Sequence, residues 1–363
     1  MSRTARAAAA LVCVVALPLA GCTTQDGDDK PGSTPSSASQ SPSESPVQYH
    51  PDIKACLLTI SGGFQDKAFS AAASEGLRRA GRELGVRTAA VPARPGEEYA
   101  DALDTLAQRG CDVVTTVSYL LGDATRVAAK QNPDVDYSIV DFSYDRPPDN
   151  LKGLLFDSAS PAFLAGYLAA GVSESGIVGT FGGAQIPSVT VYMDGFQAGV
   201  DRYNQDTGAD VVLLGWDKDA QKGTFTNDFE SRTKAQSVAS EMITQGADVI
   251  FPVAGAAGLG ALHAVQEAGV RAIWPDTDGC VSAPKYCEVL LTSVMKRMDV
   301  AVFESIKDSA EGTFDKKTYE GTLQNGGVGL APYHQQQDAV PSELDAQVKD
   351  LQQQIVDGDL EVR

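Results

Sequence analysis

Polar side chains in this 363-residue chain recur where an apolar segment passes into a turn. The first group along the chain consists of Asp66, Lys67, Ser118, Tyr119 and Asp141. A second group follows at Gly182 to Gln185, Gly255 and Asp276 to Asp278. Carboxylates accept hydrogen bonds, ammonium groups donate them and hydroxyls do both, so such groups can hold a polar small molecule. Each residue alone also fits a solvated loop or a helix cap, but together they define a candidate ligand cleft.

Catalysis is the less favoured interpretation of the same residues. Asp276 and Asp278 form a carboxylate pair that is capable of acid/base work. The sequence has no nucleophile elbow, and its three histidines, His50, His263 and His334, are scattered rather than placed for a triad or a metal cluster. We therefore expect a binding protein with no catalytic residue, no cofactor and no bound metal.

The first polar residues lie in a strand–turn–helix unit that spans residues 55–81. Its apolar start predicts a buried parallel strand, Gly62–Gly63 permits a sharp turn, and Phe69 opens a series of apolar positions at helical spacing. Ligands bind beyond the carboxyl ends of strands in open α/β sheets, so residues 61–69 are placed to contact one. The unit has no phosphate-cradling glycine pattern, which disfavours a nucleotide phosphate. It could also serve only to open a doubly wound domain.

Strands alternate with helical stretches through the remaining chain, which predicts parallel sheets with right-handed crossovers. The predicted strands cover residues 55–60, 86–91, 112–117, 137–141, 176–181, 210–215, 248–253 and 272–275, with shorter pieces at 289–294, 319–323 and 327–330. A small-residue helix at 158–171 fits a junction between two halves, and residues 344–355 predict a closing helix.

The length predicts two lobes, because about 310 residues from Ile53 onwards exceed what one hydrophobic core usually serves. We expect the first lobe at residues 52–157, completed by residues 285–320. The second lobe is expected at residues 158–284, completed by residues 321–363. The chain would then cross between two similar α/β lobes that face each other across a cleft.

The amino terminus predicts export. Two arginines precede an apolar run that is too short for a finished transmembrane helix and ends in Leu-Ala-Gly-Cys22. This resembles the bacterial lipobox, with residues 1–21 as the signal peptide and Cys22 lipidated. The alternative is an ordinary signal followed by an incidental cysteine. Residues 22–51 are rich in Ser and Pro and predict a disordered tether with a span of about 30 Å. We expect a protein anchored by lipid on the extracytoplasmic face of the cell membrane.

Charge and cysteine content fit the same compartment. A net charge of −19 disfavours nucleic acid and anionic lipid as partners, although solubility alone explains the acidity. Of six cysteines, one leaves with the signal peptide and Cys22 takes the lipid, so four remain in an oxidising compartment. Cys56 and Cys111 open strands that are neighbours in a 2-1-3 sheet order, and Cys280 and Cys287 would close a short loop. Metal binding is the alternative for these thiols, but no C-x-x-C occurs.

Several segments in a fixed order carry a family resemblance. They are SGGFQDKAFS (61–70), SPAFLAGYLAAG (160–171), VGTFGG (178–183), DGFQAGV (194–200), GADVIFPVAG (246–255), PDTDG (275–279), LTSVMKR (291–297) and GGVGLAPYH (326–334). Together they resemble the basic membrane protein family of bacterial lipoproteins, which includes the purine nucleoside receptor of nucleoside ABC importers. The resemblance covers Ala55 to Val362.

The resemblance implies a type I periplasmic-binding-protein fold, with two doubly wound parallel-sheet lobes and a nucleoside held between them for an ABC permease. We expect a monomer. The family stacks the base between two phenylalanines, which match Phe69 and Phe229, the latter in a stretch similar to the family's F-x-D-P-x-K-G. Aromatic contact of this kind needs no particular base. The alternatives are a helix core position for Phe69 and an exposed cap for Phe229.

The resemblance also implies the residues that bind the ribose hydroxyls. Asp141, Asp276 and Lys296 match the family's positions, and Gly255 would allow close approach of the backbone. The three charged residues could instead form a structural ion pair between strand ends. Asp66, Ser118 and Tyr119 complete the predicted ligand contacts, from their places after predicted strands.

Four positions depart from the family pattern, which reads D-x-G-G-x-D-D-K-S-F-N. This chain has Ile60, Gln65, Ala68 and Ser70 where the family has Asp, Asp, Ser and Asn, and residues 216–228 resemble an insertion before Phe229. The base, purine or pyrimidine, is therefore left unassigned. A sugar receptor of the same fold and a ligand-sensing lipoprotein with a signalling partner are the competing interpretations.

Overall fold

The computed structural model describes residues 48–60, 63–64, 66–93 and 98–362. The predicted signal peptide, the lipidation site Cys22, most of the tether and Gln65 lie outside the described residues. The chain separates into two units, residues 1–46 and 47–363, and every element below belongs to the second unit. None of the described helices combines the length and the apolar character needed to cross a membrane.

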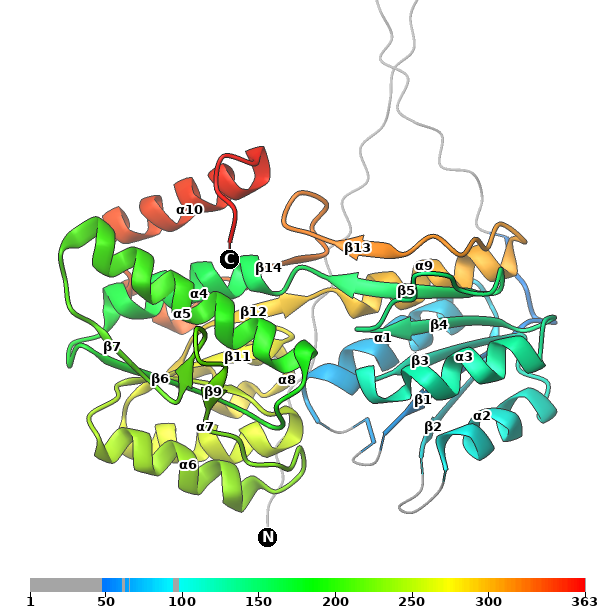
Figure 1. Ribbon diagram of the computed structural model, residues 1–363, viewed down its shortest axis with the longest axis horizontal. Helices are drawn as coiled ribbons and strands as arrows, with labels where there is room; N and C mark the ends of the chain where they lie inside the picture. Colours follow the sequence, from blue (N-terminus) through cyan, green and yellow to red (C-terminus); the bar gives the residue numbers. More distant parts are fainter. Residues whose placement is uncertain (1–47, 61–62, 65, 94–97, 363) are drawn as a thin grey trace, which may run out of the picture. The chain divides into compact units, whose positions relative to one another are not determined.

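The first of two six-stranded sheets is entirely parallel, in the order β13-β5-β4-β3-β1-β2. Its strands are β1 (Lys54–Thr59), β2 (Arg87–Pro92), β3 (Val113–Val117), β4 (Asp136–Val140), β5 (Leu151–Phe156) and β13 (Tyr319–Gly321). All five residues of β3 are buried, because helices cover both faces of the sheet. Figure 1 shows this sheet with its helices on the right.

The second sheet has the order β14-β12-β11-β10-β6-β7 and is parallel except for β14, which pairs antiparallel with β12. Its strands are β6 (Ile177–Gly182), β7 (Val212–Leu214), β10 (Val249–Val253), β11 (Arg271–Asp276), β12 (Leu290–Lys296) and β14 (Val328–Leu330). A short hairpin, β8 (Trp216–Asp217) with β9 (Lys222–Gly223), lies within the predicted insertion.

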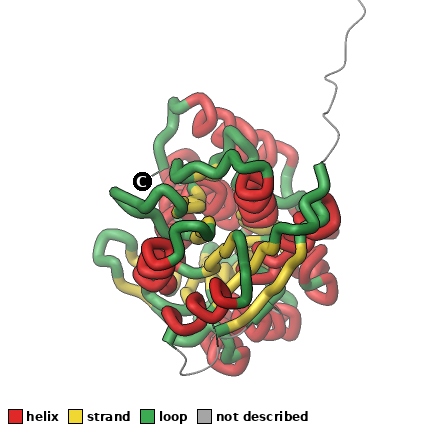
Figure 2. Tube along the Cα trace, turned by 90° about the vertical axis from the view of Figure 1, so that its right-hand side faces the viewer, coloured by secondary structure: helices red, strands yellow, loops and turns green. Residues whose placement is uncertain are grey.

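Helices flank both sheets. Those of the first are α1 (Phe69–Glu83), α2 (Tyr99–Gln108), α3 (Gly122–Gln131) and α9 (Met298–Ala310), and those of the second are α4 (Ala159–Val172), α5 (Pro187–Thr207), α6 (Arg232–Thr244), α7 (Gly258–Ala268), α8 (Gly279–Ser282) and α10 (Ser342–Asp357). Short 3-10 helices are η1 (Tyr119–Leu121), η2 (Gly255–Ala257), η3 (Pro284–Val289) and η4 (His334–Ala339). The tube in Figure 2 shows strands lying between helices.

Glycine allows the helix α4 to pack closely against α5. A Cβ at Gly166 would lie 2.0 Å from the carbonyl oxygen of Phe196, and one at Gly199 would lie 2.0 Å from that of Phe163. The helix α4 is also apolar on every side, which is typical of a core helix. The small residues at 158–171 therefore serve close packing at the start of the second lobe.

The later part of the chain is shared between the sheets differently from the expectation. Residues 285–320 were expected with the first lobe, but β12 pairs in the second sheet. Only α9, which packs against α1, and the edge strand β13 join the first. The chain thus crosses between lobes at β12–α9, at β13–β14 and at β5–α4.

Both predicted disulfides are present. Cys56 and Cys111 are bonded with their Cα atoms 5.9 Å apart, and Cys280 and Cys287 with theirs 4.5 Å apart. The first bond follows from the strand order, because β1 and β3 are neighbours as expected. It joins β1 to the loop that leads into β3.

Candidate functional site

One pocket lies where the carboxyl ends of strands from the two sheets meet. All nine residues predicted to contact a ligand line it: Asp66, Phe69, Ser118, Tyr119, Asp141, Phe229, Gly255, Asp276 and Lys296. It encloses about 760 Å³ of space free of atoms, including the part open to solvent. Small-molecule sites commonly occur at this edge of α/β sheets.

A buried lysine forms the polar centre of the pocket. Lys296 is the last residue of β12, and its Nζ donates to Asp141 Oδ2 at 2.7 Å and lies 4.0 Å from Asp276 Oδ1. The side chains of Lys296 and Asp141 are only 2% and 8% exposed. Because Asp141 follows β4 of the first sheet, this ion pair joins the two lobes across the pocket.

Asp276 also accepts a hydrogen bond from a residue that was not predicted from the sequence. The Tyr192 hydroxyl, on α5, donates to Asp276 Oδ1 at 2.7 Å. Burial raises the pKa of Asp276 from 3.8 to about 6, although Lys296 and the Tyr192 hydrogen bond oppose this rise. Asp276 and Asp141 also have positive φ angles, 69° and 65°, which are strained for non-glycine residues and aim both carboxylates at Lys296.

Asp66 caps the helix α1. Its Oδ2 accepts from Ser70 N at 2.6 Å, and its Oδ1 accepts from Ala71 N at 2.9 Å and Ala68 N at 3.2 Å. Burial raises the pKa of Asp66, and these hydrogen bonds oppose the rise. Asp66 therefore fixes the start of α1, and with it the adjacent Phe69, within the pocket wall.

Aromatic rings from both lobes form much of the remaining wall. Phe69 opens α1, and its ring centroid lies 5.0 Å from Lys296 Nζ, within the range of a cation–π contact. Phe229 lies in the loop before α6, directly over Gly183, where a Cβ would come within 2.3 Å of the ring. Only glycine at 183 leaves room for Phe229 in this position.

A contact between the lobes is made by the turn that precedes α1. The Lys67 carbonyl oxygen accepts from Trp274 Nε1 at 3.2 Å and from Thr277 Oγ1 at 3.0 Å. Ala68, the next residue, is fully buried in the hydrophobic cluster of the second lobe that contains Trp274. The turn before α1 is therefore anchored in the opposite lobe.

Several pocket residues were not predicted from the sequence. Tyr192 and Glu230 are the polar ones that matter most, and the others are Ile186, Ser188, Val189, Val253, Ala256 and Pro275, with Gly63 in the turn already noted. Tyr192 lies in α5 only two residues before the DGFQAGV segment, where its spacing resembles that of a core residue. Glu230 adjoins Phe229 and could have been found from that position.

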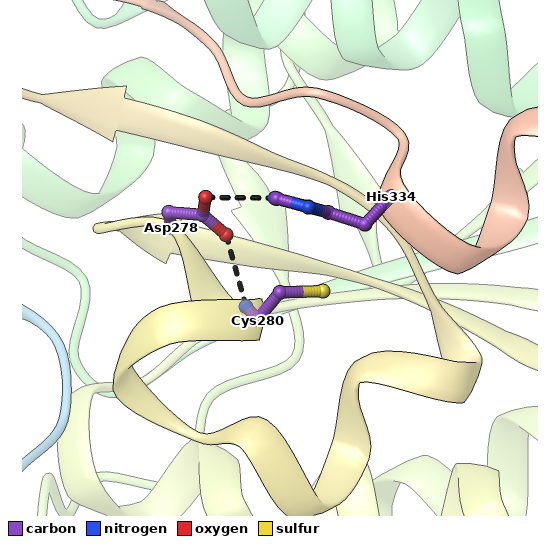
Figure 3. A group of neighbouring side chains, drawn as sticks. All are labelled: Asp278, Cys280 and His334. Atoms are coloured by element: carbon purple, nitrogen blue, oxygen red, sulfur yellow. Dashed lines mark hydrogen bonds and ion pairs between the residues drawn. The ribbon is translucent and has the colours of Figure 1, made fainter. Parts of the chain in front are cut away.

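A cluster beside the pocket, Asp278, Cys280 and His334, brings together groups of the kinds that bind metals (Figure 3). The sulfur of Cys280 is bonded to Cys287 and so offers no thiolate. Asp278 Oδ2 instead pairs with His334 Nε2 at 2.8 Å, while its Oδ1 accepts from Cys280 N at 2.9 Å and caps α8. This contact holds η4 against the end of β11.

We expect ligand affinity to fall as the pH drops below about 6. A ligand whose hydroxyls donate to Asp276 favours its ionised form, whereas the raised pKa means that the empty pocket takes up a proton as the pH falls from 7 to 5. The stability of the unliganded protein changes with pH in the opposite direction. Because the folded state holds the proton of Asp276 more tightly than the unfolded state does, this residue lowers the free energy of unfolding as the pH rises from 3.8 towards 6.

Calorimetric titrations at pH 5, 6 and 7 measure how ligand affinity depends on pH. The other charged groups facing Asp276 are Lys296, Asp141 and Asp66, so the matched control is Asp276→Asn. A variant that keeps the full pH dependence of ligand binding would show that another group titrates.

A family model described as "ABC transporter substrate-binding protein PnrA-like" matches residues 53–363. Among curated relatives, the CD4+ T-cell-stimulating antigen of Listeria monocytogenes is 30% identical over 330 residues, covering 86% of this chain and 88% of the relative. Basic membrane protein A of Borreliella burgdorferi is 29% identical over 316 residues, covering 85% and 87%.

Solved structures agree with the fold. An ABC transporter solute-binding protein from Aeropyrum pernix superposes with a TM-score of 0.77 at 26% identity, covering 85% of this chain and 92% of that one. One from Conexibacter woesei gives 0.67 at 24% identity, covering 86% and 98%. The two sheets, their order and the pocket between them are those of a type I periplasmic-binding-protein fold. The chain belongs to the PnrA-like family of ABC transporter substrate-binding proteins.

Proposed function

We propose that this protein is a lipid-anchored receptor that binds a nucleoside between its lobes, without chemical change, and presents it as a monomer to an ABC permease. The observation that carries the proposal is the composition of the pocket, in which the Lys296–Asp141–Asp276 cluster shares a wall with Phe69 and Phe229. The charged cluster suits the two neighbouring hydroxyls of a sugar, and the two phenylalanines suit the flat ring of a base.

The cluster is suited to vicinal hydroxyls. Carboxylate oxygens of Asp141 and Asp276 accept hydrogen bonds from hydroxyls, and the Lys296 ammonium donates to a hydroxyl oxygen. Charge-assisted hydrogen bonds of this kind contribute about 1.5–3 kcal/mol each. The lining acids also outnumber Lys296, the one Lys or Arg among the described lining residues, so the pocket favours a neutral ligand over a phosphorylated one.

The aromatic side suits the base. Stacking on one aromatic ring contributes about 1–3 kcal/mol per base and depends little on base identity. Phe69 comes from the first lobe and Phe229 from the second, so a base that contacts both rings would draw the lobes together. This is the expected coupling between ligand binding and lobe closure.

Thermal shift with a panel of ligands tests the proposal. A nucleoside at a hundred times its Kd should stabilise the protein by about 2.7 kcal/mol. Ribose or the free base at the same concentration should stabilise it less, because each engages only half of the pocket. The matched control is Asp141→Asn, which should lose the shift. A clear shift with a hexose and none with any nucleoside would refute nucleoside binding and indicate a sugar receptor instead.

The anchor has a separate test, which rests on the sequence around Cys22. Cys22→Ala should leave the protein in the soluble fraction or unprocessed by the lipoprotein peptidase, because the acylated thiol is missing. Cys13→Ala, within the signal, is the matched control. A Cys22→Ala protein that is processed and still bound to membranes would refute lipid anchoring.

A further inference from the structure

One carboxylate in the pocket is not used by the protein itself. Of the four acidic side chains among the described lining residues, three bind groups of the protein, as shown above: Asp66, Asp141 and Asp276. The fourth, Glu230, is exposed at the pocket and its carboxylate has no hydrogen-bond or ion-pair partner among the described residues. Its acceptor oxygens are available to a ligand.

The loop that carries Glu230 is fixed to the pocket wall. Asp228 Oδ1 accepts from the backbone N–H groups of Glu230 at 2.8 Å and Ser231 at 3.0 Å, and its Oδ2 receives Lys234 Nζ at 3.0 Å. These bonds lower the pKa of Asp228 to about 2. Next to Glu230, the Phe229 carbonyl accepts from Ala257 N at 2.9 Å. The backbone of Glu230 is thus held on both sides, directly beside the Phe229 ring.

In the part of the chain that the structure describes, the pocket wall next to β1 has no polar side chain that could accept a hydrogen bond from a base in the way Glu230 can. Ile60, which follows β1, lines the pocket with carbon atoms only and can neither donate nor accept a hydrogen bond. A base with N–H groups on its edge would lose their hydration in the pocket, and an unsatisfied donor is costly. Glu230 is the described pocket carboxylate that remains to accept from them.

We infer that Glu230 selects the base, by accepting hydrogen bonds from adjacent N–H groups on the edge of a base stacked against Phe229. The inference rests on the proposed nucleoside function and names its substrate class. A carboxylate accepts two parallel N–H bonds, as it does from arginine. Guanine presents such a pair, its ring N1–H and its exocyclic amine. Hypoxanthine presents only the ring N–H, and unsubstituted purine presents none. The pocket therefore prefers guanosine to inosine, and inosine to purine riboside.

Calorimetry on the purified full chain tests this ranking with guanosine, inosine and purine riboside. Glu230→Gln should weaken guanosine roughly ten- to a hundredfold, because one accepting oxygen and the charge are lost, and should leave purine riboside nearly unchanged. Glu241→Gln is the matched control, since Glu241 is an exposed residue of α6 outside the pocket. It should behave as the wild type does.

The outcomes separate the two proposals. A wild type that binds all three nucleosides, with a guanosine preference that Glu230→Gln removes and Glu241→Gln keeps, is the expected result. Equal loss of all three ligands in Glu230→Gln, or an unchanged preference for guanosine, would overturn the role of Glu230 while leaving nucleoside binding in place. A wild type that binds none of them overturns the nucleoside proposal itself, and this inference with it.

Discussion

Lys296→Met should destabilise the unliganded protein by about 3–5 kcal/mol at pH 7 and abolish ligand binding. The substitution leaves Asp141 and Asp276 buried without their cation, so two carboxylates face each other in a site shielded from water. The side chain volumes of lysine and methionine are similar, so the loss reports charge rather than packing. Urea denaturation at pH 7 measures the change in the free energy of unfolding.

Two further variants make this result specific. Lys349→Met removes an exposed lysine whose partner, Asp345, lies one turn earlier on α10, and it should change stability by less than about 1 kcal/mol. Asp141→Asn in the Lys296→Met background should recover part of the lost stability, because it removes one of the unpaired charges. A Lys296→Met protein as stable as the wild type would mean that the buried pair does not hold the lobes as described.

Phe69→Leu should weaken a nucleoside by about 1–3 kcal/mol, roughly five- to a hundredfold, and leave free ribose almost unaffected. Leucine keeps apolar packing in the cluster that Phe69 joins in the first lobe, but it offers no ring face to a base. Calorimetry with both ligands separates the stacking contribution from the ribose contribution, because only the nucleoside has a base.

The control for this variant is Phe314→Leu. The Phe314 ring lies under Lys152 Nζ at 4.4 Å and outside the pocket lining, so nucleoside affinity should stay unchanged. A Phe69→Leu protein that loses ribose and nucleoside equally would show that Phe69 shapes the hydroxyl site and does not stack a base.

Much of the fold could be predicted because burial on both faces gives parallel strands an apolar run. The predicted strands agree with those of the structure to within about two residues, and the 2-1-3 order led directly to the Cys56–Cys111 bond. The strand β5 was missed because Lys152 interrupts its apolar pattern. That lysine is buried, and Asp308 of α9 holds its Nζ at 2.8 Å, a partner 156 residues away that no local pattern reveals.

Some residues of the candidate site could likewise be predicted from the sequence, and others could not. Asp141 was predictable because it ends a parallel strand, and parallel strands end at one edge of the sheet. Lys296 was indicated only by the family resemblance, since the strand predicted from the sequence stopped two residues before it. Tyr192 was missed because it projects from the middle of α5, where a tyrosine at helical spacing looks like a core residue until Asp276 is seen beside its hydroxyl. The cap formed by Asp66 likewise depends on where α1 begins, at Phe69.

A crystal structure of the protein with a bound nucleoside would show directly which pocket residues hold the ribose and which hold the base. We expect the ribose hydroxyls within hydrogen-bond distance of Asp141, Asp276 and Lys296, with the base against Phe69 and Phe229. A nucleoside bound elsewhere, or one whose ribose points away from Lys296 while another group occupies the cluster, would contradict the proposed assignment of the pocket.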